Sequence, residues 1–182
     1  ISNAKTTRTF GLIQKFEKAS GNRGNWESHW EEIARRILPN YANQFSNKGL
    51  ANSTKGDQRT EEMVDATGAL ALTRFAAAME SMLTPRHSIW HRLVPSDKTL
   101  LRDRRSRLWF ENLTTDLFKF RYAPRANFAS QKHEDWMALG AFGTGCMFTD
   151  ALKLKDEQGL RYRAIHVGEI FFLENHQGSI DT

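Results

Sequence analysis

Histidines and carboxylates approach metal-ligand spacing at two places, and both fail as metal sites. His133 and Glu134 begin like the helix of a zinc protease, but Met137 stands where a second histidine would be needed one turn later. His87 and His91 are four residues apart in a segment that we expect to be a strand. In a strand this spacing separates the two side chains by about 13 Å. We therefore expect no metal ion and no cofactor.

The glycine-rich stretch from Gly140 to Gly145 does not have the pattern of a phosphate-binding loop. No Gly-Lys-Ser/Thr follows it, and it leads from a predicted helix into a predicted strand. A phosphate loop needs the opposite order, because the N–H groups at a helix N-terminus bind the anion. We interpret these glycines as supplying positive φ angles and close packing at a turn.

No group of residues has the arrangement of an activated nucleophile. Serines and histidines are scattered, and none lies in a Gly-x-Ser-x-Gly turn. Cys146, the only cysteine, lies in an apolar stretch and is expected to be buried, so no disulfide can form within the chain. The carboxylate pairs Glu31-Glu32 and Glu61-Glu62 fall on predicted helices, where they favour solvation. We expect no catalytic residue and no enzyme.

A local excess of positive charge is the strongest candidate binding feature. The net charge is +5, and nine Lys or Arg against three acids between Lys98 and Lys132 give that stretch +6. Four arginines are concentrated there: Arg102, Arg104, Arg105 and Arg107. They cannot share one helix face, since each residue turns about 100°. They favour contact with DNA or an acidic partner surface, and a merely solvated helix face is the alternative.

The elements that position these residues follow from periodicity, caps and prolines. Four helices are expected before the glycine-rich stretch and a fifth leads into it. Their ranges are Thr6–Ala19, ended by Ser20-Gly21-Asn22; Asn25 to Pro39, capped by Asn25; Thr60–Leu83; Lys98–Tyr122; and Asn127–Leu139, capped by Asn127. The fourth helix is expected to point Leu101, Leu108, Trp109, Leu113, Leu117 and Phe120 inward. Trp26, Trp30, Trp109 and Trp136 are expected in the core.

The remaining segments are expected to be strands and one long loop. Tyr41–Gln58 is polar and without periodicity, which predicts a mobile loop. Strands are expected over Ser88–Pro95, Cys146–Lys155, Leu160–Val167 and Glu169–Glu174. The predicted class is α+β, mostly helical over residues 1–139 with antiparallel strands over residues 140–182. No apolar run reaches the roughly 18 residues that a membrane span needs.

Four segments in a fixed order carry a resemblance to a known family. They are Trp30-Glu-Glu-Ile-Ala-Arg-Arg-Ile-Leu-Pro39; Asp65-Ala-Thr67 with Phe75-Ala-Ala-Ala-Met79, Leu83-Thr-Pro85 and Trp90; Asn127-Phe128 with Phe142-Gly143-Thr-Gly145; and Asn175-His-Gln-Gly178-Ser-Ile-Asp181. Together they resemble the podovirus head-to-tail connecting, or portal, proteins. The structural motif residues are Asp65, Thr67, Pro85, Trp90, Gly143, Gly145 and Gly178. Ala66 and His91 depart from the family pattern, and the arginine cluster matches no motif.

The resemblance implies a structural subunit of a ring, usually of twelve copies, at one vertex of a phage capsid. It implies passage of double-stranded DNA, and contacts with the major capsid protein, scaffolding protein, terminase and tail adaptor proteins. The location would be the virion, and the host cytoplasm during assembly, with no membrane partner. Because family members are much longer, we expect residues 1–182 to be an N-terminal wing-region fragment. The alternative from charge alone is a free-standing basic nucleic-acid-binding module.

Overall fold

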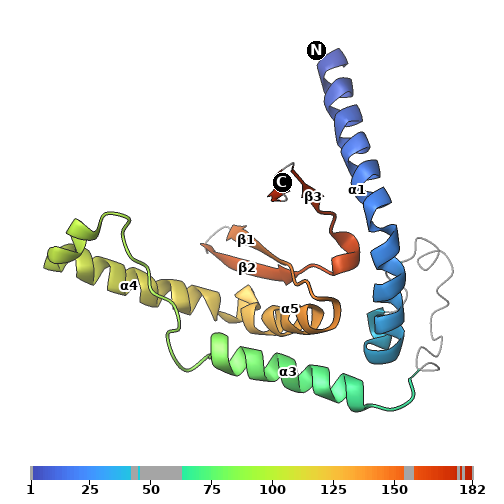
Figure 1. The fold of residues 1–182 in the computed structure, drawn as a ribbon. Coiled ribbons are helices and arrows are strands. Elements are labelled where there is room, and N and C mark those ends of the chain that lie inside the picture. Colours follow the sequence, from blue (N-terminus) through green and yellow to red (C-terminus); the bar gives the residue numbers. More distant parts are fainter. Residues whose placement is uncertain are drawn as a thin grey trace. The chain divides into compact units, whose positions relative to one another are not determined.

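The computed structural model describes residues 2–41, 45, 63–153, 158–175, 177 and 179–181 (Figure 1). The chain divides into two units, one formed by residues 1–69 and 166–182 and the other by residues 70–165. Helices dominate both, and short antiparallel strands follow at the C-terminal end. The α+β class, mainly helical first and then a small antiparallel sheet, is therefore confirmed. The predicted mobile loop over 41–58 lies outside the described residues, apart from Tyr41 and Phe45.

The first unit is built on one long helix, α1 (Ser2–Ile37). The expected break at Ser20–Asn22 and the expected cap at Asn25 are wrong, because the helix runs through both. A glycine in a helix costs only about 1 kcal/mol relative to alanine, so Gly21 does not end it. Arg23 and Glu27 also form an ion pair at 2.6 Å across the next turn. The expected end before Pro39 is confirmed, and a short 3-10 helix, η1 (Pro39–Tyr41), follows.

The C-terminal segment of the first unit is mostly irregular. It contains the 3-10 helix η4 (Val167–Glu169) and two short strands, β3 (Leu173–Glu174) and β4 (Ile180–Asp181), which pair antiparallel. The expected strands that reached Val167 and began at Glu169 are therefore wrong at these positions. His166 begins the 3-10 turn instead, because its Nδ1 accepts a hydrogen bond from the Gly168 N–H at 3.1 Å.

Helix α3 (Thr67–Leu83) begins later than the predicted Thr60. Residues 60–62 lie outside the described residues, and 63–66 are not helical. The start is fixed by Asp65, whose Oδ1 accepts a hydrogen bond from the Thr67 N–H at 2.9 Å. The strand expected over Ser88–Pro95 is also wrong, since this segment is irregular. Its Leu93 N–H donates to Thr114 Oγ1 at 3.1 Å instead of to a neighbouring strand.

The single helix expected over Lys98–Tyr122 is two elements. A 3-10 helix, η2 (Lys98–Arg102), is separated by Asp103 from α4 (Arg104–Arg121). The 3-10 helix η3 (Pro124–Ala126) then leads to α5 (Phe128–Phe142), which ends three residues later than predicted. The expected side-chain cap by Asn127 is wrong: Asn127 has φ 53° and makes no capping hydrogen bond.

The second unit contains a two-stranded antiparallel sheet of β1 (Met147–Lys153) and β2 (Gln158–Ala164). Figure 1 shows this hairpin beside α5. The core lies where β2 meets η3 and α5, and its buried members are Ala126, Phe128 and Tyr162. Cys146, expected to be buried, is only partly buried next to β1.

Many large apolar side chains that we expected in the core are exposed. Trp26 and Trp109 are 62% and 58% exposed, so the prediction is wrong for these two tryptophans. Four side chains expected inward on α4 are also wrong: Leu108, Trp109, Leu113 and Phe120 are 38–58% exposed. The buried residue of α4 is Thr114 instead. Helical periodicity identified an apolar face but did not show whether this chain itself covers it.

Candidate functional site

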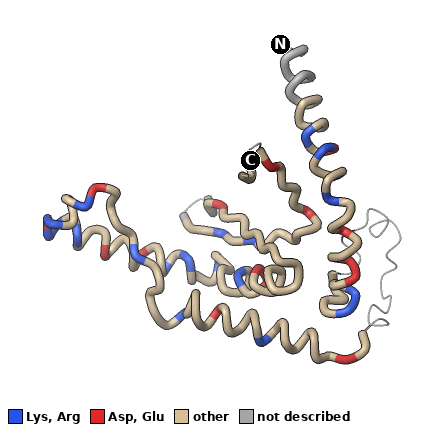
Figure 2. Tube along the Cα trace, viewed as in Figure 1, with Lys and Arg blue, Asp and Glu red and all other residues tan. Residues whose placement is uncertain are grey.

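The four candidate arginines gather where η2 meets α4, and Figure 2 shows basic residues concentrated there. Arg102 ends η2, and the other three lie in the first turn of α4. All four side chains are exposed. Among the described residues none of the four has an ion-pair partner. The cluster is therefore not neutralised by the described part of the chain.

The acids of this region act as helix caps. Asp103 Oδ2 accepts hydrogen bonds from the N–H and the hydroxyl of Ser106, both at 2.9 Å. These bonds hold the pKa of Asp103 below its ordinary value. Asp97 accepts from the Thr99 N–H at 2.9 Å, and hydrogen bonds to Thr99 likewise lower its pKa. The caps fix the backbone that carries the arginines and leave the arginines available to a partner.

The motif residues around Pro85 and Trp90 join the end of α3 to the end of α4. Trp90 Nε1 donates to the Tyr122 hydroxyl at 3.1 Å, and that hydroxyl donates to the backbone carbonyl of Thr84 at 2.9 Å. Thr84 is buried and stands directly before Pro85. Trp90 and Thr84, both from the second of the four motif segments, therefore bind the hydroxyl of Tyr122. The sequence analysis did not single out this tyrosine.

Arg121 was missed by sequence reasoning and stands at the centre of this aromatic region. Its guanidinium lies 4.8 Å from the ring centre of Trp90 and 5.4 Å from that of Phe128. It contacts the Tyr162 hydroxyl at 3.3 Å and His91 Nδ1 at 3.2 Å. Since an arginine only donates, His91 Nδ1 is the acceptor and that ring is neutral. Burial and then the Arg121 charge lower the pKa of His91.

The glycine-rich stretch performs the two roles expected of it. Gly143 ends α5 with φ 75°, in the left-handed region that favours glycine. A Cβ at Gly140 would lie 2.7 Å from Leu72 Cδ1 and 2.8 Å from Phe75 Cδ1, so α5 and α3 pack closely there. A Cβ at Gly145 would lie 2.9 Å from the carbonyl oxygen of Asp135 and contact its carboxylate. Gly178 lies outside the described residues.

Asp135 is a buried carboxylate directly under Gly145. It is 6% exposed, and its Oδ2 pairs with Lys132 Nζ at 2.6 Å. Lys132 in turn lies 3.9 Å from the ring centre of Trp136. A buried charge is tolerated when it is paired, and this ion pair lies within α5, since both residues belong to that helix.

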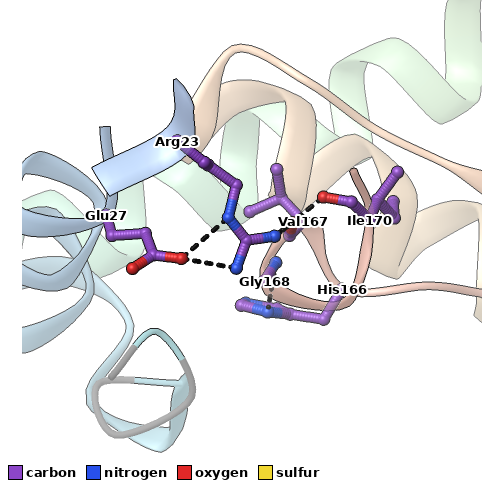
Figure 3. A network of polar contacts seen from close by, with 6 residues as sticks. All are labelled: Arg23, Glu27, His166, Val167, Gly168 and Ile170. Atoms are coloured by element: carbon purple, nitrogen blue, oxygen red, sulfur yellow. Dashed lines mark hydrogen bonds and ion pairs between the residues drawn. The ribbon is translucent and has the colours of Figure 1, made fainter. Parts of the chain in front are cut away.

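In the first unit Arg23 connects α1 to the C-terminal segment (Figure 3). Its Nη1 donates to the Ile170 carbonyl at 2.8 Å and to the Val167 carbonyl at 3.5 Å, while Nε and Nη2 donate to Glu27. Its guanidinium also lies 4.1 Å from the ring centre of Phe171. Sequence reasoning missed this role, since the partners are backbone carbonyls more than 140 residues away.

Within the described residues, the histidines and carboxylates with near-ligand spacing do not converge. His133 Nδ1 lies 3.4 Å from Glu80, while His91 contacts Arg121. Glu31 and Glu32 pair with Arg35 and Arg36 one turn later, and Glu61 and Glu62 lie outside the described residues. No group of three or more potential ligand side chains is found in the described part of the chain. None of its helices has the length and apolar character of a membrane span.

Comparison with known proteins finds relatives among phage portal proteins. The probable portal protein of Bordetella phage BPP-1 is 28% identical over 180 residues, which is 98% of this chain and 31% of that protein. The portal protein of Salmonella phage epsilon15 is 23% identical over 174 residues, which is 94% of this chain and 29% of that protein. The chain thus spans about a third of the length of these relatives. Residues 10–182 match the family described as bacteriophage head to tail connecting protein, and the chain belongs to that family.

Proposed function

We propose that this chain is the N-terminal, wing-region part of a phage portal subunit. The subunits form a closed ring, usually of twelve copies, at one capsid vertex, and double-stranded DNA passes through it during packaging and ejection. The observation that carries the proposal is the family match over residues 10–182. Both relatives reported above are themselves named as portal proteins or probable portal proteins.

The surface of the second unit supports a role within an assembly. Its exposed large apolar side chains include Met82 at 78%, Val94 at 60%, Trp109 at 58% and Phe148 at 52%. These side chains lie on α3, on the segment before η2, on α4 and on β1, and a partner surface that packs there would cover them. In a ring each subunit meets two neighbours through different faces, so exposed faces on several elements are expected.

The arginine cluster supports contact with a negatively charged partner. All four arginines are exposed, and Arg104, Arg105 and Arg107 lie in the first turn of α4, where the helix dipole disfavours positive charge. Helix stability therefore does not account for them, and contact with DNA phosphates or an acidic protein surface does. If the partner is DNA, Arg104→Ala with Arg107→Ala lowers the salt slope of binding by nearly one unit per lost phosphate contact. An unchanged slope points to an acidic protein surface.

The other partners follow from the same role. The major capsid protein and scaffolding protein surround the ring in the host cytoplasm during assembly. Terminase docks for packaging and supplies the ATPase activity, and tail adaptor proteins replace it in the virion. The chain itself contributes surfaces and no catalytic group.

Imaging the full-length protein tests the proposal. Negative-stain electron microscopy is expected to show rings with a central hole, and light scattering the mass of a multimer. A monomer at every concentration overturns the ring. Salt-sensitive DNA binding by such a monomer would support the alternative of a free-standing nucleic-acid-binding module.

A further inference from the structure

One face of α4 carries a stripe of three exposed apolar residues with an arginine at its N-terminal end. Arg105, Trp109, Leu113 and Phe120, here called the α4 stripe, fall within about 80° of helix surface at 100° per residue. The three apolar side chains are 58%, 38% and 52% exposed, and Arg105 is exposed. Trp109 stacks edge-on against Phe110, the residue next to it. The described part of the chain leaves this face uncovered.

The N-terminal part of α1 carries a second exposed stripe of opposite charge. Phe10, Ile13 and Glu17, here called the α1 stripe, fall within about 60° of helix surface. Phe10 and Ile13 are 61% and 49% exposed, and Glu17 is exposed. Among the described side chains Glu17 has no ion-pair partner, and neither does Arg105.

The two stripes match in order and spacing. Glu17 to Phe10 spans about 11 Å along α1, and Arg105 to Leu113 spans about 12 Å along α4. If the helices run antiparallel, then Arg105 faces Glu17, Trp109 faces Ile13 and Leu113 faces Phe10. We propose that the α4 stripe of one copy of this chain packs on the α1 stripe of the next copy in the ring.

A second copy is the partner that the observations favour. A ring of identical subunits closes through two different faces that complement each other on the same chain. The two stripes are such a pair, since each is apolar along its length and they end in opposite charges. Phosphates of DNA could neutralise Arg105, but they offer nothing to cover Trp109, Leu113 and Phe120. The inference rests on the proposed ring, and it names the contact that closes it.

Charge reversal tests the pairing in the full-length protein. Arg105→Glu and Glu17→Arg are each expected to lower the fraction of protein found in rings about tenfold, because each places like charges together. The double reversal restores the opposite charges and is expected to return the ring fraction close to that of the unmodified protein. The matched control is Lys15→Glu, an exposed residue about 200° around α1 from Glu17, which should leave the ring fraction unchanged.

The outcomes separate this inference from the proposed function. If the unmodified protein forms no ring, then the proposed function fails. If it forms rings and both single reversals do so equally well, then the ring stands and this contact is wrong. If the single reversals fail and the double reversal does not restore assembly, then the Arg105–Glu17 pairing is wrong. Circular dichroism of each variant checks that the helices are intact.

Crosslinking tests the same contact without relying on charge. With Cys146 replaced by serine, Phe10→Cys together with Leu113→Cys provides one thiol on each stripe. A short thiol-specific crosslinker is expected to give a ladder of linked subunits. Leu108→Cys in place of Leu113→Cys is the control, because Leu108 lies off the stripe and is similarly exposed at 46%. Crosslinks only within single chains would overturn the inference.

Discussion

Gly145 and Asp135 show how one residue decides the geometry of the helix-to-hairpin connection. The carbonyl oxygen of Asp135 would lie 2.9 Å from a Cβ at Gly145. Such a contact has no room to relax, because Asp135 is buried and already paired with Lys132. The resemblance marked Gly145 as a motif residue, and the structure supplies the physical reason.

Gly145→Ala is therefore expected to destabilise the protein by about 1–3 kcal/mol, the usual cost of forcing an extra carbon into a packed site. Thermal or urea unfolding followed by circular dichroism measures the change. Gly11→Ala is the control, because a Cβ there meets nothing within 4 Å. Equal stability of the two variants would contradict the proposed packing role of Gly145.

His91 makes stability depend on pH. Burial and the Arg121 charge lower its pKa in the folded protein below the value of about 6.5 that it has when unfolded. The unfolded chain then binds the proton more tightly, so the contribution of His91 to stability is fully present above pH 6.5 and is lost as the pH drops through 6.5 towards the folded pKa. His166 acts in the same direction, mainly through its burial.

The melting temperature is accordingly expected to be lower at pH 5.5 than at pH 7.5. His91→Asn removes one of the titrating groups and is expected to reduce this difference. His87→Asn, at an exposed position four residues earlier, is the matched substitution for comparison. A pH dependence that is the same in both variants would show that His91 does not contribute.

Among the elements, α1 shows where local signals mislead. Ser20-Gly21-Asn22 and Gly24 favour a break, and the helix nevertheless continues. Helix propensity is a weak influence of about 1 kcal/mol per glycine, and tertiary contacts exceed it. Here Arg23 donates to carbonyls of the C-terminal segment, a contact that no local pattern could indicate.

Gly21→Ala together with Gly24→Ala is expected to stabilise the first unit by about 0.5–1 kcal/mol per substitution. Both positions lie inside α1, and a Cβ at either would meet nothing within 4 Å. Chemical denaturation should show a higher midpoint than for the unmodified chain. A lower midpoint would mean that these glycines serve a contact with another molecule.

For the other elements, whether the prediction was right depends on the kind of sequence signal behind it. Pro39 and Pro85 marked the ends of α1 and α3 correctly, because proline cannot continue a helix. The strand expected over 88–95 failed, since alternation does not guarantee a partner strand, and Leu93 bonds to Thr114. The Arg121 cluster draws residues from four separate segments, and only the fold brings them together.

For the whole molecule, composition predicted the class but not what covers the apolar faces. The apolar residues of α4 were identified correctly and then assigned to a core that the described chain does not build around them. Sequence periodicity cannot distinguish a face covered within the chain from one covered by another subunit. The family motifs predicted the fold because their residues hold helices and strands together. For the same reason they contain no catalytic group.

The full-length protein is expected to show no hydrolytic activity of its own. No residues of the sequence have the spacing of a phosphate-binding loop, a metal-ligand set or an activated nucleophile. Purified rings assayed for ATP turnover and metal-dependent DNA cleavage should match a buffer control. Activity that a point mutation in residues 1–182 abolishes would refute this expectation.

Because α1 is long, its N-terminal end lies far from the hydrogen bonds that Arg23 makes. Its 36 residues span about 54 Å, and Arg23 lies about 32 Å from the first of them. Near its middle the helix is attached to the C-terminal segment by the Arg23 bonds to two backbone carbonyls, and nearer its N-terminus by the contact of Phe16 with Phe171. If α1 tilted by about 5° about Arg23, its N-terminal end would move by about 3 Å, which is about the length of one hydrogen bond.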